Sequence, residues 1–175
     1  MQTKYMDFLD LAKKRHSVRK YTNKPVEKEK LDKIIEAAHV APTAANIQPV
    51  KIFVVQSRDG LEKVGKAANA YGAPTVLVVC TDKTKAWKRP FDGMITTDID
   101  ASILTDHMML EATQQGLGTV WICHFKPDVL KEELSIPEEL VPVNILAVGY
   151  ADEPEVQEGT FNKQRKPIDE LASYI

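Results

Sequence analysis

The fold of this chain is decided by residues 95–123, which read ITTDIDASILTDHMMLEATQQGLGTVWIC. The run from Ile95 to Gln115 contains no Gly or Pro and predicts a long helix. Gly116 and Gly118 follow at once, and glycine is favoured just beyond the C-terminus of a helix. The β-branched and aromatic side chains of Thr119–Cys123 then predict a strand. The stretch therefore predicts a long helix followed directly by a strand.

Apolar residues lie on two sides of this predicted helix. At about 100° per residue, the first stripe consists of Ile95, Ile99, Ile103, Leu110 and Leu117, and the second, roughly opposite, of Ala101, Leu104, Met108 and Ala112. Both sides must be covered, either within one domain or by the domain's own core on one side and a partner subunit on the other. Asp106 falls within the first stripe, which predicts a buried structural carboxylate held by hydrogen bonds.

The rest of the chain alternates between helical and strand patterns. Further helices are predicted at Met6–Lys14, Glu27–Val40, Leu61–Ala68 and Val129–Leu134. Strands are predicted at Val50–Gln56, Thr75–Cys80 and Val143–Gly149. Thr75–Cys80 is continuously β-branched or apolar, which favours burial on both faces of a sheet. The sequence thus predicts an α+β fold with a small mixed β-sheet flanked by helices, and a C-terminal arm over residues 152–175.

Length and composition limit the possible functions. The chain has 175 residues, which favours a single domain over residues 1–175, and carries 23 Lys and Arg against 25 Asp and Glu. This balance argues against a protein that binds nucleic acid or a membrane surface through basic charge. No apolar run approaches the length needed to span a bilayer, and the N-terminus lacks the apolar segment of a secretory signal. With only Cys80 and Cys123, a disulfide scaffold is not expected, and the default is a reduced, cytoplasmic protein.

Three polar clusters are candidates for chemistry. Residues 15–20 (RHSVRK) place arginines on both sides of a serine, and residues 163–167 (KQRKP) are again basic. Such groups can hold a phosphate, although a solvated surface is the simpler interpretation of each alone. Residues 41–49 (APTAANIQP) combine small side chains with two carboxamides, which suits a flat heteroaromatic ligand, although a rigid helix–strand connector is the favoured interpretation of this cluster alone. The four histidines have no metal-ligand spacing, so no metal is predicted.

Taken together and in this order, these clusters resemble the nitroreductase family of flavin enzymes. The resemblance is carried by residues 15–19 (RHSVR), 41–49 (APTAANIQP), 53–55 (FVV), 116–122 (GLGTVWI), 148–150 (VGY) and 163–167 (KQRKP). It implies a nitroreductase-like three-layer sandwich and an intertwined homodimer, with FMN bound between the subunits. Val50 departs from the Trp of many relatives, and the chain lacks their long insertions. The loop at residues 83–94 supplies part of the missing cover over the flavin or is a plain surface loop.

The resemblance also implies roles for individual residues. The FMN phosphate would be held by Arg15, Ser17, Lys163 and Arg165. His16 would lie beside the ribityl chain or the ring edge. Arg19 would place a cation near the flavin N1, where negative charge accumulates on reduction.

On the ring side, the resemblance implies contributions from both subunits. The second subunit would contribute Pro42, Thr43, Ala44 and Asn46. The first would contribute Asn69 and the segment Ile122, Cys123 and His124, from which a backbone N–H would point at the flavin N5.

The implied reaction is a ping-pong oxidoreduction. NADH or NADPH would reduce the flavin, and a small acceptor such as a nitroaromatic or quinone would then be reduced on the same face. The flavin carries this chemistry, so no catalytic side chain is predicted. Cys123 and His124 suggest a nucleophile pair, but adjacent strand residues point to opposite faces. The alternatives are a dehalogenating or flavin-degrading enzyme of the same fold, or a flavin-binding protein without turnover.

Overall fold

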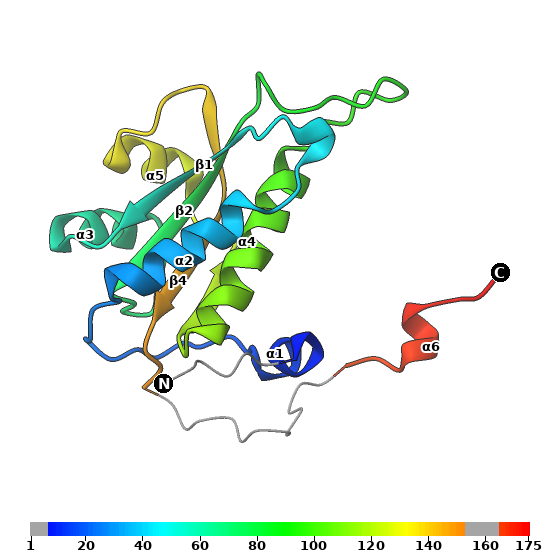
Figure 1. Ribbon diagram of the computed structural model, residues 1–175. Coiled ribbons are helices and arrows are strands. Elements are labelled where there is room, and N and C mark those ends of the chain that lie inside the picture. The colour runs from blue at the N-terminus through cyan, green and yellow to red at the C-terminus, as the bar shows by residue number, and fades with distance from the viewer. Residues whose placement is uncertain (1–6, 153–164) are drawn as a thin grey trace.

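The computed structural model describes residues 7–152 and 165–175 (Figure 1). Its helices are α1 (Phe8–Lys14), α2 (Lys28–His39), the short 3-10 helix η1 (Ala44–Asn46), α3 (Arg58–Ala67), α4 (Thr97–Gln114), α5 (Pro127–Leu134) and α6 (Ile168–Leu171). Its strands are β1 (Val50–Val55), β2 (Thr75–Asp82), β3 (Gly118–Ile122) and β4 (Leu140–Gly149). Every helix and strand predicted from the sequence is present, with ends displaced by a few residues. The sequence did not indicate η1 or α6.

The four strands form one sheet in the order β1-β2-β4-β3. All three pairings between these strands are antiparallel. The sequence analysis expected a mixed sheet, but among the described residues a parallel pairing occurs only at the isolated bridge between Ser17 and Thr119. The residue types in a predicted strand do not show whether its neighbour runs parallel or antiparallel to it. The direction of pairing is therefore known only from the structure.

The sheet is the middle of three layers. Helices α2 and α4 cover one face, where they pack on Leu77, Val79 and Leu146, while α3 and α5 cover the other, where Val64 and Leu130 join the core. Figure 1 shows these pairs of helices on opposite sides of β2 and β4. Every residue of β2 is buried, as predicted for a strand covered on both faces. The α+β class and the three-layer sandwich are therefore confirmed.

The two stripes of α4 have different environments. In the second stripe Ala101, Met108 and Ala112 are fully buried against the sheet. In the first stripe Ile95 and Ile99 are 43% and 46% exposed. The prediction of a buried Asp106 was wrong because this side of α4 faces outward in a single chain. One side of the helix thus belongs to the core of its own domain, and the other presents apolar side chains at the surface.

The C-terminal part of the chain lies apart from these layers. Figure 1 shows α6 away from the sheet and its helices. Four apolar side chains of this C-terminal part are exposed: Ile168, Leu171, Tyr174 and Ile175. Within the described ranges, the protein has no helix of the length and apolarity that crossing a membrane requires.

Candidate functional site

The basic segment after α1 runs along the start of β3. Asp7 caps α1 by accepting the N–H of Leu9 at 3.0 Å. Beyond the helix, Ser17 pairs with Thr119 as a bridge, and the Val18 N–H donates to the Thr119 carbonyl at 2.9 Å. Val18 is buried, so the segment is fixed to the sheet. This anchoring places the side chains around Ser17 at the edge strand of the sheet, beside α4.

Arg15 is the most enclosed cation of this segment. Its side chain is half-buried, and Nη1 lies 4.0 Å from the sulfur of Met109 on α4. Burial is the largest cause that lowers the pKa of Arg15, and the nearby charge of Arg165 lowers it further, while Asp106 acts in the opposite direction. Arg165 is therefore close enough to act electrostatically on Arg15, although the two residues lie at opposite ends of the chain.

The other side chains of the segment have local contacts. His16 Nδ1 lies 3.2 Å from the carbonyl of Lys14. Arg19 is exposed, and its Nη1 donates to the carbonyl of Ser17 at 3.4 Å. Lys163, predicted beside the same phosphate, lies outside the described residues.

A second group of predicted residues lies at the far end of β3. Ile122 is buried and is the last residue of the strand, whereas Cys123 and His124 follow in an exposed loop. The bridge between Ala68 and Phe125 joins this loop to the end of α3. That contact places Asn69, which accepts the Tyr71 N–H at 2.8 Å, beside the same loop. The predicted ring-side residues 69 and 122–124 are thus neighbours, separated from Ser17 by the length of β3.

The loop from Pro42 to Pro49 lies elsewhere. Figure 1 shows this loop (cyan) at one end of α4 and α1 at the other. Ala44 contacts Asp100 and Arg15 contacts Met109, so the two contacts are nine helical residues apart, or roughly 13 Å along the axis at 1.5 Å per residue. A single chain therefore keeps the predicted residues Pro42, Thr43, Ala44 and Asn46 apart from the basic segment.

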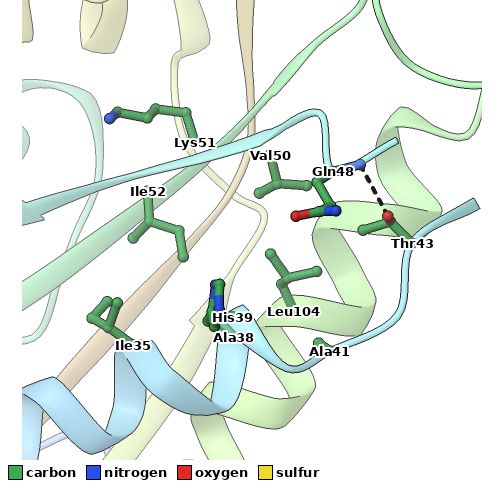
Figure 2. A pocket seen from close by; sticks show the side chains of 10 residues that line it. All are labelled: Ile35, Ala38, His39, Ala41, Thr43, Gln48, Val50, Lys51, Ile52 and Leu104. Atoms are coloured by element: carbon green, nitrogen blue, oxygen red, sulfur yellow. Dashed lines mark hydrogen bonds between the residues drawn. The ribbon is translucent and has the colours of Figure 1, made fainter. Parts of the chain in front are cut away.

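A groove opens beside this loop. Its volume is about 310 Å³, and it lies between the C-terminal half of α2, the start of β1 and Leu104 of α4 (Figure 2). Thr43 and Gln48 line the end nearest the loop, and the Gln48 N–H donates to Thr43 Oγ1 at 3.0 Å. Of the predicted site residues, Thr43 alone lines this groove, which the sequence analysis did not single out.

One feature of the site was missed from the sequence. Asp100, not Asp106, is the buried carboxylate of α4, and it holds the backbone of Ala44. A signal was present, because Asp100 is adjacent to Ala101 and shares a helix face with Leu104, both in the second stripe.

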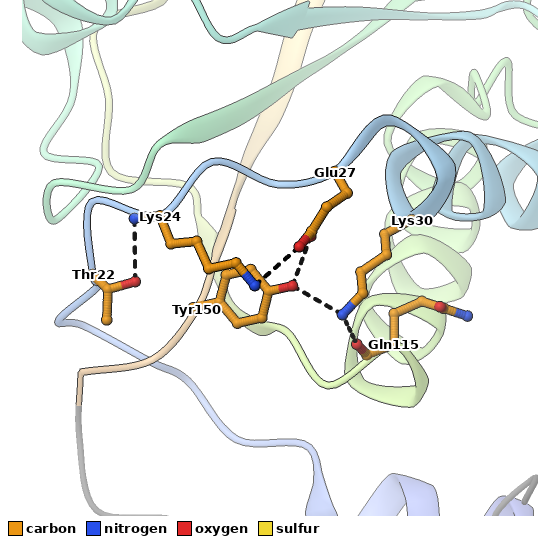
Figure 3. A network of polar contacts seen from close by, with 6 residues as sticks. All are labelled: Thr22, Lys24, Glu27, Lys30, Gln115 and Tyr150. Atoms are coloured by element: carbon orange, nitrogen blue, oxygen red, sulfur yellow. Dashed lines mark hydrogen bonds and ion pairs between the residues drawn. The ribbon is translucent and has the colours of Figure 1, made fainter. Parts of the chain in front are cut away.

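Tyr150 organises a polar network next to the site. Tyr150 Oη donates to Glu27 at 2.6 Å and accepts from Lys30 at 3.0 Å, and Lys30 also donates to the Gln115 carbonyl at 2.7 Å (Figure 3). The Lys24 ammonium lies 3.9 Å from the ring centroid. The hydrogen bond from Tyr150 is the largest cause that lowers the pKa of Glu27 to about 2. The network ties the ends of β4 and α4 to the start of α2.

Among the described residues, the geometry indicates neither a metal site nor thiolate chemistry at Cys80. Within residues 7–152 and 165–175, no three His, Cys, Asp or Glu side chains are grouped to hold a metal ion. Burial raises the pKa of the Cys80 thiol to about 12, so it remains protonated at neutral pH. Cys123 is a free, exposed thiol.

Comparisons with known proteins agree on one family. The model of the nitroreductase family matches residues 12–70 and 62–150. A Bacillus subtilis protein named FMN reductase [NAD(P)H] is 30% identical and is aligned over 91% of this chain and 74% of its own length. The crystal structure of a nitroreductase family protein from Clostridium difficile 630 superposes with a TM-score of 0.92 at 50% identity, over 97% of this chain and 98% of that one. An FMN-dependent nitroreductase from Clostridium difficile R20291 superposes with a TM-score of 0.71 at 31% identity, over 84% and 89% of the two chains.

Proposed function

This chain belongs to the nitroreductase family, and we propose that it is an FMN-dependent oxidoreductase that uses NADH or NADPH to reduce a small acceptor, such as a nitroaromatic or a quinone. The two half-reactions follow each other in ping-pong order. Bound FMN supplies the hydride chemistry, so the protein needs no nucleophile or general acid of its own. The protein's side chains bind and orient the FMN and compensate its negative charge.

The observation that carries the proposal is that the charge of Arg165 acts on Arg15. Burial is the largest cause that lowers the pKa of Arg15, and the charge of the exposed Arg165 lowers it further because like charges repel. A dianionic phosphate between them would reverse this cost, because guanidinium groups form strong charge-assisted hydrogen bonds with phosphate oxygens. We therefore assign the FMN phosphate to this pair.

A hydroxyl group nearby fits the same ligand. Ser17 is bridge-paired with Thr119 beside Arg15. Thr119 is 1% exposed, and among the described residues its Oγ1 has no hydrogen-bond partner. A hydroxyl can donate to a phosphate oxygen. The donor set of two guanidinium groups and the hydroxyl of the partly exposed Ser17 thus matches a phosphate, whereas the Thr119 hydroxyl is enclosed by the chain itself.

The residues at the other end of β3 suit the flavin ring. Cys123, His124 and Asn69 are exposed and lie next to one another, so a flat ligand can reach their backbone. Arg19 is exposed on the basic segment, and by the family resemblance its cation would stabilise the negative charge that develops on the ring during reduction. These assignments orient the phosphate toward Ser17 and the ring toward Ile122.

A second copy of the chain would complete the site. The loop of Pro42, Thr43, Ala44 and Asn46 lies at the opposite end of α4 from Arg15. The exposed Ile99 on α4 and the exposed Ile95, which lies just before this helix, form an apolar surface that a partner would cover. In a homodimer arranged about these surfaces, the loop of one chain would reach the flavin bound by the other.

Absorption spectroscopy of the purified protein tests the proposal. Reconstitution with FMN should give the visible band of protein-bound oxidised flavin, and anaerobic NADH or NADPH should bleach it. Addition of a quinone or nitroaromatic should restore the band. Failure to bind FMN would refute the flavin assignment, and a bound flavin that neither nicotinamide bleaches would indicate a flavin-binding protein without this activity.

A further inference from the structure

A fully buried carboxylate lies beneath the loop of residues 43–48. Asp100, in the first turn of α4, is 0% exposed. Its Oδ1 accepts the backbone N–H of Ala44 at 2.9 Å, and its Oδ2 accepts the hydroxyl of Thr96 at 2.9 Å. Burial of a carboxylate requires such donors. One donor comes from the start of α4 itself, and the other comes from the loop.

The backbone conformation of this loop must be stabilised by contacts with residues outside it. Ala45, Asn46 and Gln48 have φ angles of 50°, 55° and 55°, in the left-handed region that side chains other than glycine rarely adopt. Such residues persist only where surrounding structure constrains them. The hydrogen bond between Thr43 and Gln48 lies inside the loop and cannot fix its place on the protein. Among the described residues, the bond from Ala44 to Asp100 is the one that joins residues 43–48 to another element.

The chemistry of the acceptor suits this task. A carboxylate is a stronger acceptor than a neutral oxygen, and the first turn of α4 is a favourable place for negative charge. Asp100 is carried by the longest helix of the domain, whose second stripe packs on the sheet. The loop is therefore tied to one of the most rigid parts of the molecule.

We propose that Asp100 is a positioning residue of the flavin site, which holds the loop so that Thr43, Ala44 and Asn46 meet the FMN of the partner chain. The inference rests on the proposed function. In this proposal Asp100 is buried and does not touch FMN. Its role is to hold in place, before FMN binds, the loop residues that do touch it.

The test compares the loss of the two hydrogen bonds that the Asp100 carboxylate accepts, one from Ala44 and one from Thr96. Asp100→Ala removes the acceptor for Ala44, whereas Thr96→Val removes the bond from the helix side, together with the contact of the Thr96 hydroxyl with the Trp87 carbonyl, and leaves the loop held. Asp100→Asn keeps one oxygen for the Ala44 N–H and is the conservative variant. For each full-length protein we would measure the FMN dissociation constant, the thermal midpoint, the sedimentation coefficient and the hydrogen-exchange rate of the amides at 43–48.

Asp100→Ala should bind FMN about tenfold or more weakly, as expected for a lost hydrogen bond to a charged group, and its loop amides should exchange faster. Asp100→Asn should recover most of the affinity. Thr96→Val should lower the thermal midpoint without changing the affinity. If Asp100→Ala does not fold, Asp100→Ser, whose hydroxyl is too short to reach the loop, takes its place.

Two results would overturn the inference. One is unchanged FMN affinity and exchange in Asp100→Ala or its substitute, and the other is an equal loss of affinity in Thr96→Val, which would indicate general destabilisation. A wild-type protein that does not bind FMN would refute the proposed function and this inference with it. Wild-type binding combined with unaffected Asp100 variants would refute this inference alone.

Discussion

Gly118 and Val18 lie so close together that no side chain fits between them. A Cβ atom at Gly118 would lie 2.6 Å from Val18 Cγ2 and 3.1 Å from Cγ1. The sequence analysis interpreted both glycines after α4 as a helix end, and Gly116, with φ of 75°, does have that role. Gly118 has a different one, because it lets the basic segment pack directly on the first residue of β3.

We therefore expect Gly118→Ala to displace the basic segment. The added methyl group would push Val18 outward, which overpacks the core at a cost of about 1–3 kcal/mol in the free energy of unfolding. The displacement would also move Arg15 and Ser17 and weaken FMN binding. Chemical denaturation and FMN titration measure the two effects.

Gly65→Ala is the matched control for this substitution. Gly65 lies within α3, and a Cβ there would meet nothing within 4 Å. Alanine in a helix interior is favoured over glycine by about 0.5–1 kcal/mol, so this variant should be as stable as the wild type or more so, with unchanged FMN binding. Equal stability and FMN affinity in both variants would contradict the role given to Gly118.

Sequence periodicity predicted the helices and strands well, but it could not predict which side of a helix packs against the sheet. The apolar pattern of residues 95–115 located α4 and its two stripes, because helical spacing is a local property. Which stripe is buried depends on the sheet, so Asp106 was placed inside the protein although it is exposed. Asp100 was missed for the same reason.

The loop of residues 43–48 shows a different limit. Small residues and carboxamides indicated a ligand-binding connector, but Ala45 and Asn46 gave no sign of left-handed backbone, which is typical of glycine. Ala44, next to them, donates its backbone N–H to Asp100, more than fifty residues away in the chain. Tertiary hydrogen bonds of this kind leave no periodic signal in the sequence.

The two cysteines should differ sharply in reactivity. Cys80 is fully buried and burial raises its pKa to about 12, whereas Cys123 is exposed. Iodoacetamide at pH 8 should therefore modify one thiol in the folded protein and two after denaturation, as counted by mass spectrometry. If the flavin ring lies against residues 122–124, saturation with FMN should slow the reaction.

Cys123→Ser provides the control for this labelling, since it should abolish modification of the folded protein. Rapid alkylation of Cys80 in that variant would show that the core opens readily. A Cys123 rate that FMN leaves unchanged would argue against the ring position proposed for this loop.

The stability of the protein should fall in acid partly because of Glu27. Its pKa in the folded state is lowered from 4.5 to about 2, first by the hydrogen bond from Tyr150 and next by the one from Lys24. A lowered folded-state pKa stabilises the protein fully above the unfolded value, and this contribution is lost as the pH falls from about 4.5 toward 2. Glu27→Gln should therefore show a flatter loss of thermal midpoint across this range, whereas Glu29→Gln, an exposed neighbour on α2, should follow the wild type. Identical pH profiles for all three proteins would contradict the role of the network.

Arg15→Ala should weaken the binding of FMN but not of riboflavin. Loss of one hydrogen bond to a charged group costs about 1.5–3 kcal/mol, or roughly a 10- to 150-fold rise in the dissociation constant. Riboflavin has the same ring and ribityl chain without the phosphate, so its affinity should change little. Flavin fluorescence titration of the wild type and the variant with both ligands measures the difference. An equal loss for the two ligands would mean that Arg15 does not contact the phosphate.

Ile99→Glu should separate the proposed homodimer. Ile99 is 46% exposed on the outward stripe of α4, where a carboxylate would be buried against the partner chain without a counter-charge. Gly65→Glu adds the same charge on α3, across the sheet, at an open position where a new side chain meets no neighbour. In analytical ultracentrifugation the wild type and Gly65→Glu should sediment as dimers and Ile99→Glu as a monomer with weakened FMN binding, because the loop of Thr43 and Asn46 would no longer reach the flavin. A monomeric wild type that binds FMN fully, or a dimeric Ile99→Glu, would refute the shared site.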